Sequence, residues 1–142
     1  MKRILLLFAL ILLSCSNDDD NSQSESQNLI VGVWKPIKEI DRCPNQADDV
    51  YNLTECEQMG RLTFNSNGTL SDTGFNENGE DCEISYESNS TWEIRNGELF
   101  VDDNGVEEKV EFFEVTQNIL KLGELDNDFC NGGIYFTEYQ KV

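Results

Sequence analysis

Leu62-Thr63-Phe64-Asn65-Ser66-Asn67-Gly68-Thr69-Leu70 is the stretch that indicates the fold most clearly. Apolar and polar residues alternate on both sides of a turn made of asparagine, serine and glycine. Alternation with a period of two is typical of a half-buried strand, and an Asn-Gly pair readily adopts the positive φ angles of a tight hairpin. These nine residues therefore predict two antiparallel strands joined by a short turn.

The same pattern recurs along most of the chain. Further turns rich in asparagine, aspartate and glycine fall at residues 76–79, 96–97, 102–105 and 131–133. The alternating runs between the turns predict strands at about residues 30–40, 60–65, 69–75, 83–88, 91–95, 98–102, 107–116, 119–123 and 133–141. One helical turn is expected between Asp48 and Gln58. The chain is thus predicted to be an all-β antiparallel meander of 8–9 strands, which would remove its exposed edges by closing into a barrel.

Residues 1–14 have the composition of a signal peptide. Lys2 and Arg3 precede ten apolar residues, whereas a helix that spans a membrane needs about 20. The next residues, Leu12-Leu13-Ser14-Cys15, resemble the lipobox of bacterial lipoproteins, in which the cysteine is diacylglycerated and the chain is cut before it. The resemblance implies a lipid anchor on Cys15. An ordinary secretory signal with a chance cysteine is the alternative.

Residues 15–28 are expected to form a flexible acidic tether, because no apolar residue occurs from Asn17 to Asn28. Ser16 stands where an aspartate would resemble an inner-membrane retention signal, which favours the outer membrane. The run from Ser16 to Asp20 also resembles the acidic tags that send some Gram-negative lipoproteins to the cell surface. A periplasmic and a surface-exposed orientation both stay open.

Residues 29–142 are long enough for one domain with its own core. Without the leader the chain has 8 basic and 28 acidic residues, so its formal charge is 8 − 28 = −20. This charge and the scattered basic residues argue against nucleic-acid binding. The expected partners are the outer membrane, through the lipid, and a small hydrophobic ligand. The protein is expected to be a monomer without a cofactor.

Four cysteines remain once Cys15 carries lipid, and an exported protein favours disulfides. Three pairings are open. We favour Cys56–Cys82, which would close a local three-strand unit, and Cys43–Cys130, which would tie the first long loop to the last hairpin. A structural zinc site is the alternative, but the chain has no Cys-x-x-Cys spacing and no histidine.

The whole domain at 29–142 is similar to bacterial lipocalin-like lipoprotein domains. The similarity rests on Gly32-Val33-Trp34-Lys35, on the hairpin at 62–70, on Trp92 with the residues around it, and on the short runs at 97–99 and 118–122. It implies a small lipocalin-like barrel, with Trp34 plugging its base rather than contacting a ligand. Lipocalins commonly cover this tryptophan with an arginine from the end of the barrel, and this chain has Lys141 there.

The chain is not expected to be an enzyme. Without histidine it cannot form a Ser-His or Cys-His nucleophile pair, and its many acids single out no carboxylate pair for glycoside hydrolysis. The loops at 102–105 and 126–128 hold oxygen ligands that calcium could use, but turns have the same composition, so no metal site is predicted.

Two hypotheses for function remain. One is ligand binding in the barrel mouth, with a lining drawn from apolar residues at presumed inward positions: Phe64, Leu70, Trp92, Leu99, Phe112, Leu122 and Phe136. The alternative is a non-catalytic structural or interaction protein of the cell envelope, in which the same residues fill a small core.

Overall fold

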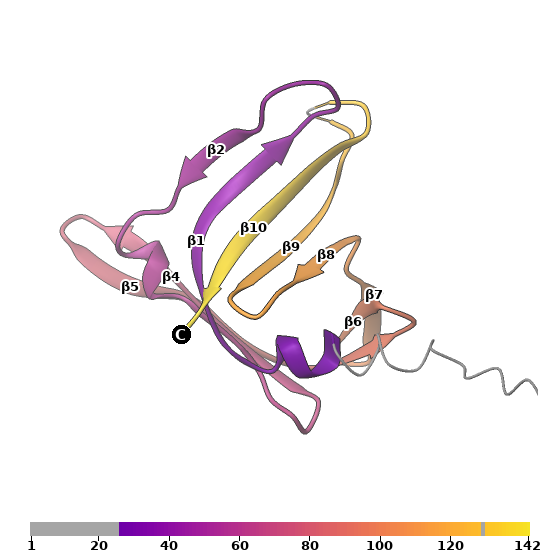
Figure 1. The fold of residues 1–142 in the computed structure, drawn as a ribbon. Helices are drawn as coiled ribbons and strands as arrows, with labels where there is room; N and C mark the ends of the chain where they lie inside the picture. The colour runs from indigo at the N-terminus through magenta and orange to yellow at the C-terminus, as the bar shows by residue number, and fades with distance from the viewer. Residues whose placement is uncertain (1–25, 129) are drawn as a thin grey trace, which may run out of the picture.

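The computed structural model describes residues 26–128 and 130–142 (Figure 1). A short helical segment at residues 26–30 precedes the first strand. The elements that follow are β1 (Gly32–Arg42), β2 (Asp49–Asn52), the 3-10 turn η1 (Glu57–Met59), β3 (Arg61–Phe64), β4 (Thr69–Asn78), β5 (Asp81–Arg95), β6 (Glu98–Asp103), β7 (Val106–Lys109), β8 (Phe112–Val115), β9 (Ile119–Asp126) and β10 (Gly133–Lys141).

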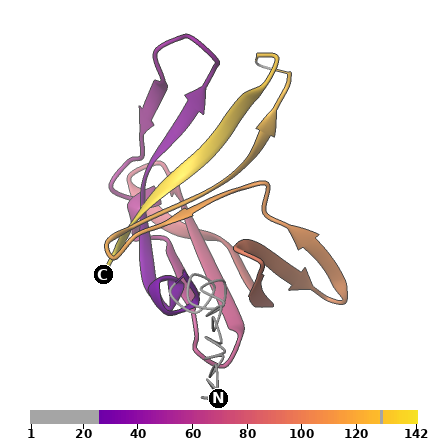
Figure 2. The same cartoon turned by 45° about the vertical axis from the view of Figure 1, so that its right-hand side comes forward.

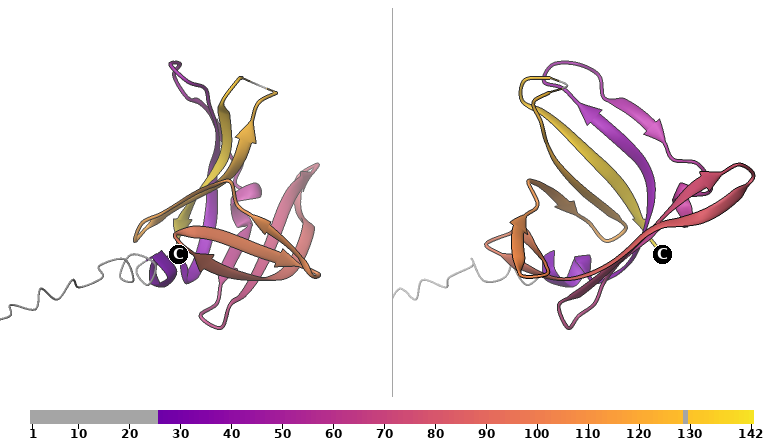
Figure 3. Two further views of the ribbon diagram at one scale, coloured as in Figure 1. Left: turned by 90° about the vertical axis from the view of Figure 1, so that its right-hand side faces the viewer. Right: turned by 180° about the vertical axis from the view of Figure 1, so that it is seen from behind.

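All the strands belong to one antiparallel sheet, in the order β7-β6-β5-β4-β3-β1-β10-β9-β8. β2 pairs with the second half of β1, on the side where β3 pairs with the first half. The sheet curls strongly into a half-barrel, as the two views of Figure 3 show. The predicted all-β antiparallel class is therefore confirmed. The sheet ends at β7 and β8, which pair with β6 and β9 respectively and not with each other.

Three strands differ in kind from the sequence prediction: one is merged, one is divided and one was not expected. The expected strands 83–88 and 91–95 are one strand, β5, because Asn89 and Ser90 stay paired with β4. The expected strand 107–116 is two strands. β7 pairs with β6, the Val110 N–H makes one more bond to the Leu99 carbonyl of β6, and from Phe112 onward the chain pairs with β9. β2 was not predicted, since all four of its side chains are exposed and it lacks an apolar period.

Two β-bulges help to curl the sheet. One lies in β1, where Ile37 is the extra residue between Pro36 and Lys38, and the other in β5, where Ser85 is the extra residue opposite Gly74 and Phe75 of β4. At Gly74 an added Cβ would collide with the ring of Tyr86, its cross-strand partner on β5. This close approach requires glycine.

The core lies on the concave side of the sheet. Its fully or almost fully buried members are Ile30, Trp34, Leu62, Phe64, Leu70, Trp92, Ile94, Leu99 and Leu120. Phe64 and Trp92 meet edge to face with their ring centroids 5.4 Å apart. The Trp92 indole N–H is shared between the carbonyls of Asn65 and Thr69, so this core residue also fixes the hairpin at 62–70.

Trp34 is completely buried where the two ends of the domain meet. Its indole N–H donates to the Ile30 carbonyl at 2.7 Å, which ties β1 to the helical segment before it. The Lys141 ammonium lies 4.9 Å from the centre of the Trp34 ring and donates to the Leu29 carbonyl at 2.9 Å. Lys141 thus covers the tryptophan, in the place where the resemblance implies a basic residue from the end of the barrel.

The start of the domain differs from the expected tether. Residues 26–28 are helical rather than part of an unstructured linker, and the following Ile30 is buried, so the strand begins at Gly32 and not at residue 30. The expected signal peptide, Cys15 and the tether up to residue 25 lie outside the described residues. The described residues contain no helix long and apolar enough to cross a membrane.

Two disulfides join segments that are distant in the sequence, and they are the pairs that we favoured from the sequence. Cys43–Cys130 links the loop after β1 to the turn before β10, with the Cα atoms 5.9 Å apart. Cys56–Cys82 links the segment before η1 to the start of β5.

Candidate ligand-binding site

An open hollow of about 580 Å³ lies between the two ends of the sheet, where β7 and β8 do not pair. Figure 2 shows the β6–β7 hairpin projecting on the right, while the chain that follows it runs back across the molecule to the turn before β9. The hollow is lined by Val101, Glu108, Lys109, Val110, Glu111, Leu122, Gly123, Glu124 and Tyr135. These residues come from β6, β7, the 110–111 connection, β9 and β10.

The floor of the hollow is apolar and rests on the core. Val101, Val110 and Leu122 all pack against the core cluster while facing the hollow. Because their positions are set by the core behind them, the floor is preformed. Tyr135 completes it from β10, where alternation places it on the same concave face as Tyr139.

The rim of the hollow is acidic. Glu108, Glu111 and Glu124 outnumber Lys109, whose ammonium is already paired with Glu98 at 3.0 Å. One Glu111 oxygen accepts the Leu125 N–H at 2.8 Å. β8 pairs only with residues 120–123 of β9, so the Leu125 N–H has no partner on β8. The Glu111 carboxylate takes that place and satisfies this edge donor of β9.

The phenol of Tyr135 lies in this negative field. Burial raises the pKa of Tyr135, and so do its hydrogen bond to Glu39 and the charges of Glu39, Asp41 and Glu124. Tyr135 therefore stays protonated, and its ring presents a neutral aromatic surface to the hollow.

A second, more polar hollow of about 190 Å³ lies under β1, β3, β4 and β5. Its most notable group is Asp72, whose pKa is raised by burial although the carboxylate accepts a 3.1 Å hydrogen bond from the Tyr86 hydroxyl. Burial and the negative charge of Asp72 raise the pKa of Tyr86 to about 12. Tyr139 also lines this hollow, and burial raises the pKa of Tyr139 as well.

The structure divides the seven predicted lining residues into three groups. Phe64, Leu70, Trp92 and Leu99 are buried within the core cluster. Leu122 packs against that cluster and also lines the large hollow.

The presumed inward position of Phe112 and Phe136 is wrong. Their neighbours Phe113 and Tyr139 pack on the core, so alternation places Phe112 and Phe136 on the convex face. There the two rings lie 4.8 Å apart across Gly123, which separates them in the sheet. A side chain at Gly123 would collide with the backbone and Cβ of β10.

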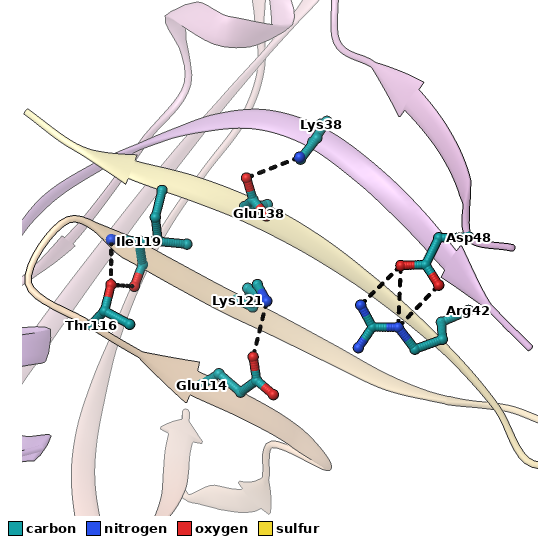
Figure 4. Close-up of polar contacts among 8 residues, drawn as sticks. All are labelled: Lys38, Arg42, Asp48, Glu114, Thr116, Ile119, Lys121 and Glu138. Atoms are coloured by element: carbon teal, nitrogen blue, oxygen red, sulfur yellow. Dashed lines mark hydrogen bonds and ion pairs between the residues drawn. The ribbon is translucent and has the colours of Figure 1, made fainter. Parts of the chain in front are cut away.

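Ion pairs cover the convex face of β1, β10 and β9 (Figure 4). Lys38 pairs with Glu138 at 3.1 Å, Arg42 with Asp48 at 2.9 Å and Lys121 with Glu114 at 3.0 Å. Arg42 and Lys121 also lie over the Phe136 ring, at 4.9 and 5.8 Å. Each of these cations has an acidic partner, so the face carries no net positive patch.

The acidic loops serve as turns. Asp102 accepts the Gly105 N–H at 2.8 Å, and Asp126 accepts the Asp128 N–H at 3.0 Å. Within residues 26–128 and 130–142, no group of three or more acidic or cysteine side chains is arranged to hold a metal ion.

Sequence reasoning missed most of the large hollow. Val101, Val110, Tyr135 and the glutamates of the rim were not predicted as lining residues. The alternation of β10 contains the signal for Tyr135, which lies on the face opposite to Phe136. The prediction took the face of Phe136 as the inner one and therefore missed Tyr135.

Comparison with known proteins supports the fold. Residues 30–122, more than half of the chain, match the family model of the lipocalin-like domain. No curated protein and no solved structure matches the chain. With its curled antiparallel sheet and its tryptophan at the base, the protein belongs to the lipocalin-like domain family.

Proposed function

We propose that this protein is a lipoprotein anchored to the outer membrane, whose lipocalin-like domain binds a small apolar or amphipathic molecule. The observation that carries the proposal is the hollow of about 580 Å³ at the unpaired ends of the sheet. Ligand pockets in proteins commonly have volumes of about 300–1,000 Å³. The polar hollow of about 190 Å³ lies below this range.

The binding site is the hollow and not the centre of the half-barrel. The centre is filled by large side chains such as Trp34, Phe64 and Leu99, each no more than 1% exposed. An apolar ligand group in the hollow would instead cover Val101, Val110 and Leu122, which the core holds in place. Burying their remaining exposed surface would favour binding by about 25 cal/mol per Å² of apolar area before the costs of association.

Binding can be tested with N-phenyl-1-naphthylamine, a neutral probe that fluoresces in apolar surroundings. Val110→Trp would place a bulky indole in the hollow and cover part of its apolar floor, so we expect it to weaken probe binding at least tenfold. Val106→Trp is the matched control, because Val106 is exposed on β7 and does not line the hollow. Equal binding by both variants would refute the assignment of the site. Native mass spectrometry of protein from its own host would then identify the natural ligand.

The anchor is proposed from the leader and from Cys15. Cys15→Ser should abolish incorporation of an alkyne-labelled fatty acid and release the protein from the membrane fraction. Retention of label in this variant would disprove the assigned lipid site. Protease treatment of intact cells would separate the two orientations, since only a surface-exposed domain would be degraded.

A non-catalytic envelope protein that acts through contacts alone is the second candidate. The filled core favours it, because five large side chains of the core cluster are less than 2% exposed: Ile30, Trp34, Phe64, Leu99 and Leu120. Such a protein should bind no apolar probe, and Val110→Trp should leave its cellular role unchanged.

A further inference from the structure

The large hollow combines an apolar floor with a rim of one charge sign. Its lining includes the three acids Glu108, Glu111 and Glu124 and a single base, Lys109. The formal charge of the lining is therefore 1 − 3 = −2. The apolar floor defines the place where a ligand binds, and the rim determines which head group can remain next to it.

The single base does not offset this charge for a ligand. The Lys109 ammonium is paired with Glu98, which does not line the hollow. A ligand carboxylate or sulfate that sought Lys109 would have to displace Glu98 while approaching three other carboxylates. Like charges at such short range are repulsive, so the rim disfavours fatty acids and other anionic amphiphiles.

The floor offers a cation a further favourable surface. Tyr135 pairs with Asp41 on β1 and with Glu124 on β9, so a carboxylate flanks it on either side in the sheet, and Glu124 also lines the hollow. An aromatic face beside carboxylates is the arrangement that attracts alkylated ammonium groups, through cation–π attraction and charge. Tyr135 lines the same hollow as Leu122, so a head group at Tyr135 and an alkyl chain on the floor can be bound together.

We infer that the ligand of this hollow is a cationic amphiphile, an alkyl chain that carries an ammonium or quaternary ammonium head. The inference rests on the proposed function and adds the chemical class of the ligand. It states that the head group of the ligand is positively charged, whereas the family resemblance implies only an apolar or amphipathic ligand.

Three probes with the same dodecyl tail test the inference: dodecyltrimethylammonium, dodecyl maltoside and dodecyl sulfate. Each is titrated by calorimetry into the protein below its critical micelle concentration, in 150 mM salt. We expect the trimethylammonium probe to bind about tenfold more tightly than the neutral maltoside. The sulfate should bind more weakly than both. The advantage of the cation should shrink as salt is added, because the rim is open to solvent.

A charge-matched pair of variants separates the rim from the overall acidity of the protein. Glu124→Gln should reduce the affinity for the trimethylammonium probe severalfold and leave the affinity for the maltoside unchanged. Glu83→Gln changes the net charge equally, but Glu83 is exposed on β5 and does not line the hollow. We expect this control to leave all three affinities within twofold of the wild type.

The outcomes distinguish the two levels of the proposal. If the maltoside binds and the cation binds no more tightly, or if Glu83→Gln weakens the cation as much as Glu124→Gln does, the inference is overturned and the proposed function stands. If none of the three probes binds, the proposed function itself fails.

Discussion

Lys141 is expected to hold the base of the domain together, and Lys141→Met tests this role. Methionine keeps a long flexible side chain but removes the charge. The substitution deletes the 2.9 Å hydrogen bond to the Leu29 carbonyl and the cation 4.9 Å from the Trp34 ring centre. It leaves a partly buried carbonyl without that donor.

The expected loss follows from these two contacts. A hydrogen bond from a charged group contributes about 1.5–3 kcal/mol, and a partly exposed cation–π contact about 0.5–1 kcal/mol. The new methyl group regains part of this by packing on the indole. We therefore expect Lys141→Met to lower the free energy of unfolding by about 2 kcal/mol, which corresponds to roughly 8 °C in Tm for a domain of this size.

Urea denaturation followed by tryptophan fluorescence measures the loss. Lys141→Arg is the control, because it retains the charge and the donors, and it should stay within about 1 kcal/mol of the wild type. A methionine variant as stable as the wild type would show that the cation contributes nothing. An arginine variant as unstable as the methionine variant would show that shape matters and charge does not.

Gly32 provides a second test of the same arrangement. Its φ is +143°, and a Cβ at this position would lie 2.6 Å from Lys141 Cε. Gly32→Ala should therefore be destabilising, and part of its cost should disappear in a Lys141→Ala background, where the clash is relieved. If the losses of the two single variants simply add in the double variant, the destabilisation by Gly32→Ala comes from backbone strain alone.

Two further predictions concern the disulfides and a buried acid. In the loop-closure model, replacing Cys43 and Cys130 by alanine should lower the free energy of unfolding by about 4.6 kcal/mol, because that bond spans 87 residues. Replacing Cys56 and Cys82 should lower it by about 3.5 kcal/mol, because that bond spans 26 residues. Urea denaturation measures both losses, and a larger loss for the shorter loop would rule out chain entropy as the dominant cause. Burial raises the pKa of the Asp72 carboxyl above its ordinary value of 3.8. The contribution of Asp72 to the free energy of unfolding is therefore fully present below pH 3.8, where the carboxyl is protonated, and is lost as the pH rises through the folded-state pKa. Asp72→Asn should thus raise Tm at pH 7 relative to the wild type, and thermal melts should show this advantage shrinking towards pH 4; a constant advantage would exclude the carboxylate as its source.

The hairpins could be predicted because their signals are local. Asn96 and Gly97 both have positive φ, at 55° and 80°, and so do Asn104 and Gly105, at 55° and 86°. Few residues other than glycine and asparagine adopt such angles without strain, so these pairs mark the turns directly. The two disulfide pairs followed from the resulting order of strands.

The inner face of β10 could not be predicted, because both of its faces are aromatic. Tyr135 and Tyr139 lie on the concave side, while Phe136 is buried on the convex side against Phe112. Hydrophobicity favours Phe136 as the inward residue. What makes the outward position favourable is Gly123 on the neighbouring strand, whose missing side chain lets the two phenylalanine rings meet. A pattern read along one strand does not contain that information.

The open seam between β7 and β8 links the departure from a closed barrel to the candidate site. Pairing these two strands would close the sheet across the hollow, so the break at residues 110–111 both ends the ladder and creates the space. A filled core and a ligand site are therefore compatible in this domain, because they occupy different places. A ligand that binds only the open, folded form must stabilise it, by about 2.7 kcal/mol when its concentration is 100 times its Kd. For a domain of this size that is roughly 10 °C in Tm, so thermal melts with the trimethylammonium probe should rise by this amount in the wild type and remain unchanged in Val110→Trp.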